Sequence, residues 1–191
     1  MNVFIIPEDF RHDQYILKPI IQAMLNAKGV KAKVQVCVNP LLYGITEAMR
    51  WERISEIMDR YGYRVDLFIL CVDRDGIEHR RIRLNNLEEK ARDFLPEGKL
   101  FLAENAWQEI EVWVLAGHTD LPQTWRWQDV RSEPHPKEMY FEPFARQKGI
   151  SDTPDGGRRK LAEEAARNYL RIRQLCPEDI RNLEDRIPSL M

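Results

Sequence analysis

The amino-acid sequence predicts an α/β protein with a mostly parallel, four-stranded, Rossmann-like sheet flanked by helices. Apolar strand patterns and amphipathic helix patterns alternate through the first half of the chain, as they do in parallel sheets with right-handed crossovers. Residues 65–72 form a nearly continuous apolar run, which is typical of a central strand covered on both faces. Toward the C-terminus only helical patterns remain, and they predict a helical extension.

Each element of the first half has a recognisable pattern. A first strand at residues 2–6 ends at Pro7, Asp13 is expected to cap the next helix, and Gly29 is expected to end it. Alternating valines within residues 32–38 indicate a half-exposed edge strand. The remaining elements expected in this half are helices at 14–28, 45–61 and 79–95 and a fourth strand at 99–103.

The second half is expected to be helical. Helices are predicted at 106–117, 137–147, 158–175 and 177–187, and an ordered Pro- and Trp-rich loop at 121–136. Residues 1–117 are therefore assigned to the α/β domain and residues 118–191 to a helical extension packed on it. We expect the two to form one structural unit.

Composition excludes several classes of protein. Charged residues make up 31% of the 191 residues and the net charge is −2, so global charge favours no particular partner. Cys37, Cys71 and Cys176 are far apart and include no Cys-x-x-Cys pair, which argues against a zinc ribbon or a disulfide framework and suits a cytoplasmic protein. No apolar run reaches the length of a membrane span, and no membrane association is expected.

The most informative stretch is the end of the third predicted strand, where Asp73 and Asp75 are followed by Gly76. Alternate side chains of a strand point the same way, so both carboxylates are expected to converge on one divalent cation. The alternative is a simple Asp-Gly turn preceded by a solvated aspartate.

Glu8 follows the first predicted strand directly. If the first and third strands are neighbours, Glu8, Asp73 and Asp75 meet at the carboxyl edge of the sheet, where ligands bind in open parallel sheets. Three crowded carboxylates raise the pKa values of one another unless a cation is present. The alternative role of Glu8 is to complement the dipole of the next helix.

Glu8, Asp73 and Asp75 together resemble the acidic residues of the Toprim domain of topoisomerases, primases and related nucleases. The resemblance covers about the first half of the chain. It departs from the family at Asp9, because many Toprim domains have glycine directly after the glutamate. It implies a Toprim-like fold and an Mg²⁺- or Mn²⁺-dependent nuclease activity.

Glu111 and Trp113 belong to a Glu-x-Trp helix pattern that is similar to that of small uncharacterised Toprim-like proteins. These are related to the Toprim part of overcoming-lysogenization-defect nucleases, and some are encoded beside an ATPase. By this resemblance Glu111 helps hold a second metal ion, with Glu109 and Glu104 as alternatives. The resemblance also suggests a role in phage defence with an ATPase partner.

Asp13 and a basic residue complete the site that the resemblance implies. Asp13 joins the metal ligands, although helix capping is an alternative role. Lys160 or Arg159 assists the phosphate. The cluster of Arg158, Arg159 and Lys160 follows two glycines at a predicted helix start, an arrangement that suits phosphate binding.

Helical spacing distinguishes the candidate glutamates. On the helix expected at 106–117, Trp107 and Ile110 share the buried stripe. Glu111 lies near the edge of that stripe and Glu109 roughly opposite, so Glu111 is better placed to reach the sheet edge. The alternative is that these glutamates are solvated helix charges.

The leading hypothesis is thus a metal-dependent phosphodiesterase that acts on nucleic acid, with DNA favoured over RNA. No nucleotide-hydrolysing motif such as a Walker A loop is present. The alternative is a non-catalytic, regulatory subunit that docks onto an ATPase; a phosphotransfer receiver or phosphatase ranks last. Whether the active unit is a homodimer stays open. The docking surface of the alternative would be aromatic and would include Trp113, Trp125, Trp127, Tyr140, Phe141 and Phe144.

Overall fold

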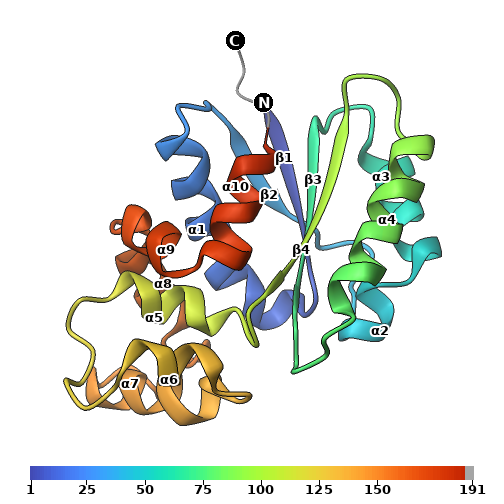
Figure 1. Ribbon diagram of the computed structural model, residues 1–191. Helices are drawn as coiled ribbons and strands as arrows, with labels where there is room; N and C mark the ends of the chain where they lie inside the picture. Colours follow the sequence, from blue (N-terminus) through green and yellow to red (C-terminus); the bar gives the residue numbers. More distant parts are fainter. Residues whose placement is uncertain (188–191) are drawn as a thin grey trace.

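A parallel four-stranded sheet forms the centre of the computed structural model, which describes residues 1–187 (Figure 1). The strands are β1 (Asn2–Pro7), β2 (Lys33–Val36), β3 (Leu67–Asp73) and β4 (Leu100–Ala106). Their order is β2-β1-β3-β4, and every pair is parallel. The predicted α/β, Rossmann-like class is confirmed, and β1 and β3 are central neighbours.

Two helical layers cover the sheet. Helix α1 (Phe10–Ala27) and the C-terminal helices lie on one side, and α3 (Trp51–Tyr61) and α4 (Arg80–Phe94) lie on the other (Figure 1). Alternate residues of β3 enter the two apolar cores, as the period of two requires. This double coverage explains why the β3 sequence is apolar throughout.

The second half of the chain is helical. Its elements are α5 (Glu111–Gly117), α6 (Trp127–Ser132), the π-helix η1 (Lys137–Phe141), α7 (Glu142–Gln147), α8 (Arg158–Ala166), α9 (Tyr169–Leu175), the π-helix η2 (Pro177–Arg181) and α10 (Asn182–Arg186). Residues of these helices share one apolar cluster with β1 and α1. Gly117 allows α5 to approach α8 closely, because a Cβ at this position would overlap Ala165. Sheet and extension are therefore built on a common core.

Several predicted boundaries differ in the structure. The segment 45–61 forms two helices, α2 (Ile45–Ala48) and α3, and the segment 158–175 likewise divides into α8 and α9. The loop predicted at 121–136 contains α6. Asp13 does not cap a helix that starts at Gln14. Helix α1 begins earlier, at Phe10, because the Asp9 side chain accepts a hydrogen bond from the Arg11 N–H at 2.8 Å.

The predicted helix at 106–117 is wrong at its start. Strand β4 continues to Ala106 because Asn105 and Ala106 pair with the last residues of β3, and α5 begins only at Glu111. Glu104 is therefore a strand residue, and its side chain is buried. The helical spacing used to compare Glu109 with Glu111 does not apply, because Glu109 precedes the helix.

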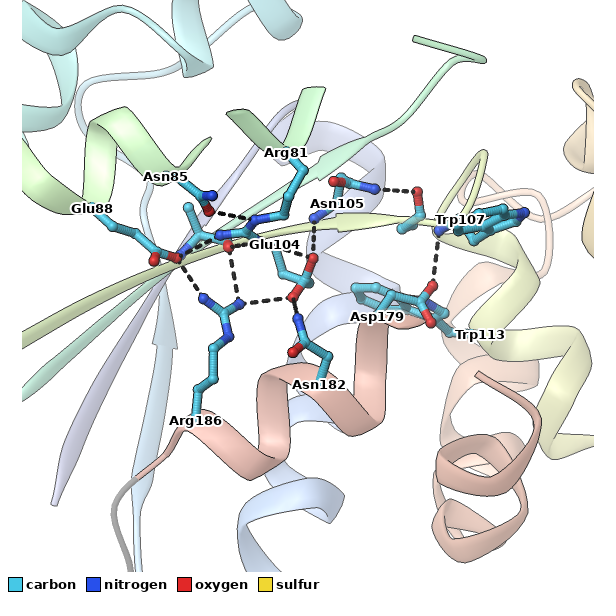
Figure 2. A network of polar contacts seen from close by, with 12 residues as sticks. Arg81, Asn85, Glu88, Glu104, Asn105, Trp107, Trp113, Asp179, Asn182 and Arg186 are labelled. Carbon is cyan, nitrogen blue, oxygen red and sulfur yellow. Dashed lines mark hydrogen bonds and ion pairs between the residues drawn. The ribbon is translucent and has the colours of Figure 1, made fainter. Parts of the chain in front are cut away.

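A network of polar side chains neutralises the charge of the buried Glu104 carboxylate and satisfies its hydrogen bonds (Figure 2). Its oxygens accept hydrogen bonds from Arg81 on α4 at 3.1 Å and from Asn182 and Arg186 on α10 at 2.8 and 2.7 Å. Arg81 and Arg186 also donate to the Ala103 carbonyl on the open edge of β4. The network therefore covers a sheet edge that would otherwise be free to pair with another strand.

A second buried carboxylate, Asp179 on η2, anchors the C-terminal helices (Figure 2). It accepts hydrogen bonds from the backbone N–H of Trp107 at 2.8 Å and from the indole N–H of Trp113 at 2.7 Å. The Arg131 guanidinium donates to both of its oxygens. Asp179 thus connects the C-terminal segment to the loop and helix that follow β4.

The aromatic residues proposed as a docking surface are largely interior. Trp113, Phe141 and Phe144 are completely buried, and Trp125, Trp127 and Tyr140 pack against the same core. The aromatic-rich sequence fills the space between α5 and the helices that follow it. Among residues 1–187, no helix has the length and apolar character needed to cross a membrane.

Replacement of Glu104 by alanine is expected to lower the free energy of unfolding by about 2 kcal/mol, because two arginines lose a buried partner. Chemical denaturation measures this value. The matched control is Glu97→Ala, which removes an exposed glutamate and is expected to change stability by less than about 0.5 kcal/mol. Equal effects of the two substitutions would contradict a structural role for the network.

Candidate functional site

An acidic pocket of about 380 Å³ opens where β1 and β3 end. In parallel sheets this position, between neighbouring strands whose connections leave in opposite directions, is the usual place of ligand sites. Helix α1, the loop before α5, and the starts of η1, α7 and α8 complete the walls. The lining residues are Glu8, Asp9, His12, Asp13, Asp73, Glu109, Glu111, Lys137, Glu142 and Arg158.

Glu8 and Asp73 are joined directly at the floor of the pocket. The backbone N–H of Asp73 donates to Glu8 Oε2 at 3.2 Å, and the Ile110 N–H donates to Asp73 Oδ1 at 2.9 Å. These contacts fix both carboxylates at the sheet edge. The predicted neighbourhood of Glu8 and Asp73 is therefore present.

Asp13 and Glu111 face the same pocket from two helices. Asp13 Oδ2 accepts a hydrogen bond at 2.7 Å from the N–H of Asp9, the N-cap residue of α1. Glu111 Oε1 accepts one from Arg158 Nη2 at 3.0 Å, and both side chains are buried. Helices α1, α5 and α8 thus bring these groups to the end of the sheet.

Burial and mutual repulsion perturb the pKa values of these acids. Burial raises the pKa of Asp73 well above its usual range, and the charges of Glu111, Asp13 and Glu8 raise it further. Burial, with the charges of Glu111 and Glu8, raises the pKa of Asp13 to about 8. Burial is also the main reason why the pKa of Glu8 is raised. The site therefore holds more carboxylates than its cations, Arg158 and Lys137, neutralise.

Either protons or a divalent cation can relieve this excess of negative charge. The donor atoms of the four carboxylates are all oxygens, which fits Mg²⁺ or Mn²⁺ and suits softer metals less well. No three of these carboxylates have ligand atoms within 4.8 Å of one another, so a cation held by three of them requires rotation of their side chains.

Asp75 does not line the pocket. Strand β3 ends at Asp73, and Asp75 adopts a left-handed conformation with φ of 51°, so the alternation expected of a strand does not extend to it. Its side chain is 45% exposed and forms an ion pair with the buried Arg80 at 2.9 Å. The Asp-x-Asp sequence therefore supplies one carboxylate to the pocket, although Asp75 stays close enough to raise the pKa of Glu8.

Glu104 and Glu109, the two alternatives to Glu111, lie in different parts of the structure. Glu104 belongs to the network beside β4, whereas Glu109 lines the pocket together with Glu111. Burial raises the pKa of Glu109 to about 7. Within residues 1–187, one group of three side chains has its ligand atoms within 4.8 Å of one another, namely Glu109, His135 and Glu138.

Of the three basic residues at the start of α8, Arg158 reaches the pocket, whereas Lys160 and Arg159 are exposed outside it. Arg159 lies over the ring of Tyr15, with its Cζ atom 4.7 Å from the centroid. Helical spacing distinguishes the three residues, because Arg158 shares the buried face of α8 with apolar residues at i+3, i+4 and i+7. Lys137 and Glu142 also line the pocket and had no signal in the sequence.

Comparison with protein-family models, with curated proteins and with solved structures gives no match to this chain.

The metal-free protein is expected to lose stability as pH rises from about 4 to about 8. Over this range the unfolded chain ionises Asp13, whose ordinary pKa is 3.8, while the folded protein retains its proton until about pH 8. Each such group contributes a slope of up to about 1.4 kcal/mol per pH unit. Urea denaturation at several pH values, with a chelator present, measures the slope.

Asp13→Asn is the matched variant for this experiment. Asparagine keeps an oxygen that accepts the Asp9 N–H but does not titrate. The free energy of unfolding of this variant is expected to fall less steeply as pH rises than that of the wild type. An unchanged slope would show that Asp13 titrates normally in the folded protein.

Proposed function

We propose that the protein is a Toprim-like phosphodiesterase that acts on nucleic acid and depends on Mg²⁺ or Mn²⁺. The observation that carries this proposal is the convergence of Glu8, Asp13, Asp73 and Glu111 in one pocket at the carboxyl ends of β1 and β3. A group of poorly solvated, mutually repelling carboxylates costs stability, and charge neutralisation by a divalent cation offsets that cost.

Glu8 and Asp73 are the central ligands of the proposed site, because they are joined at the pocket floor. Asp13 on α1 and Glu111 on α5 supply further oxygens. A bound ion would polarise the phosphate and lower the pKa of a water molecule that attacks it. When they are ionised, these carboxylates carry the negative charge that favours a cation at this position.

Arg158 takes the role of phosphate-binding cation in this proposal. Its guanidinium is held in place by Glu111 at 3.0 Å and by the Asp155 carbonyl at 3.2 Å. A planar guanidinium suits a phosphate because it offers several N–H donors in fixed directions. Arg158 is therefore positioned to stabilise charge that develops on the phosphate oxygens.

Two partly exposed cations, at or next to the acidic pocket, suit a nucleic-acid backbone. Arg74 follows Asp73 directly, and its Cζ atom lies 4.0 Å from the centroid of the Trp107 ring. Lys137 lies on the wall formed by η1. A site with an acidic centre and a basic rim can place a phosphodiester over bound metal ions. DNA is the favoured substrate, and an ATPase partner is a further part of the proposal.

Isothermal titration with Mn²⁺ tests the metal site. Wild-type protein is expected to bind Mn²⁺, and Asp73→Asn is expected to lose at least about tenfold in affinity because it removes a central ligand. His135→Ala is the matched control, because it disrupts the Glu109, His135 and Glu138 group, of which only Glu109 lines the acidic pocket. Loss of binding in His135→Ala alone would place the ion outside the proposed site.

Cleavage of supercoiled plasmid with Mn²⁺ tests the activity. Asp73→Asn is expected to abolish cleavage, and Arg158→Ala is expected to reduce its rate by about 10²-fold or more, as for loss of one donor to a developing anion. Lys160→Ala should leave the rate nearly unchanged, because Lys160 is exposed outside the pocket. A rate unaffected by Asp73→Asn, or a larger loss in Lys160→Ala than in Arg158→Ala, would overturn these assignments.

A further inference from the structure

The segment that follows β2 returns to the acidic pocket and places Tyr43 beside it. Asp9 and Tyr43 form an antiparallel backbone bridge, and the Gly44 N–H donates to the Glu8 carbonyl at 3.2 Å. Glu8 and Asp9 both line the pocket. The backbone of Tyr43 is therefore fixed next to the proposed metal ligands.

The ring of Tyr43 is 62% exposed, in contrast to the many aromatic side chains that fill the core. Arg11, on the first turn of α1, lies over this ring with its Cζ atom 5.8 Å from the centroid. Arg11 lies between Asp9 and His12 in the sequence, and both of these line the pocket. An exposed aromatic face and a cation thus lie together beside the pocket.

The same combination occurs a second time, in a different place. Tyr63 is 78% exposed, and Arg64 lies 5.5 Å from the centroid of its ring. Tyr63 precedes β3, so it lies at the end of the sheet opposite the pocket. Proximity to the acidic pocket is therefore what distinguishes Tyr43, and Tyr63 offers a matched control.

We propose that Tyr43 and Arg11 form a platform on which an unpaired nucleobase stacks, while the adjacent phosphodiester enters the acidic pocket. This inference rests on the proposed function and specifies its substrate class as single-stranded nucleic acid. Every base has a π-face, so stacking on an exposed ring binds single strands without regard to sequence. Bases within an intact duplex are already stacked and do not offer a free face to Tyr43.

Fluorescence anisotropy with a short labelled single-stranded DNA tests the platform, with Ca²⁺ in place of Mg²⁺ to limit cleavage. Tyr43→Ala is expected to weaken binding by roughly tenfold, as for loss of one stacked base, and Tyr43→Phe is expected to retain it. Arg11→Ala is expected to lower the slope of log affinity against log salt by about one. Tyr63→Ala should bind like the wild type.

Two failures can be told apart in this experiment. If wild-type protein binds DNA but Tyr43→Ala and Tyr63→Ala behave alike, or if duplex and single-stranded DNA bind equally well, the platform is wrong and the proposed function stands. If the wild type binds neither form of DNA, both the proposed function and the platform are overturned. Circular dichroism of each variant excludes loss of fold as the cause of weak binding.

Discussion

The concentration of partly or fully buried carboxylates at the ends of β1 and β3 is the constraint on which the functional part of this structure depends. Strand order forces Glu8 and Asp73 together, because β1 and β3 are neighbours at the centre of the sheet. Burial then raises the pKa of each, and neighbouring acids add to the effect on Asp73. Such a group persists in a folded protein only where a cation, a proton or a function compensates its cost.

The helical extension is part of this arrangement, because the pocket is incomplete without it. Arg158 comes from α8, and its partner Glu111 begins α5. Two buried carboxylates outside the pocket, Glu104 and Asp179, connect the C-terminal segment to β4 and to the loop that follows it (Figure 2). Residues 104–111 therefore contribute both to the acidic pocket and to these two networks.

The fold was predictable where local pattern and tertiary environment agree. The apolar run of β3, the alternation of β2 and the position of Glu8 after β1 led to the correct sheet and to the neighbourhood of Glu8 and Asp73. The fourth strand was expected to end at residue 103 and a helix to begin at 106, whereas β4 continues to Ala106. Pairing with β3 and the bonds from Arg81 and Arg186 to Glu104 stabilise this end of the strand. Single-sequence patterns do not contain these long-range contacts.

The site was predictable only in part, for reasons of backbone geometry. Asp75 leaves the pocket because the strand ends two residues earlier and the chain turns through a left-handed conformation. Arg158 enters it because it continues the apolar stripe of α8, a helical spacing that the resemblance, which implies Lys160 or Arg159, does not take into account. Lys137 reaches the pocket through the packing of η1, which no local pattern indicates.

Anomalous X-ray diffraction from crystals soaked in Mn²⁺ is the sharpest test of the proposed metal site, because it locates the ion without reference to activity. An anomalous peak is expected between the carboxylates of Glu8 and Asp73, with Asp13 or Glu111 nearby, and no such peak is expected in crystals of Asp73→Asn. A peak confined to Glu109, His135 and Glu138, or no peak in the pocket, would contradict the proposed site.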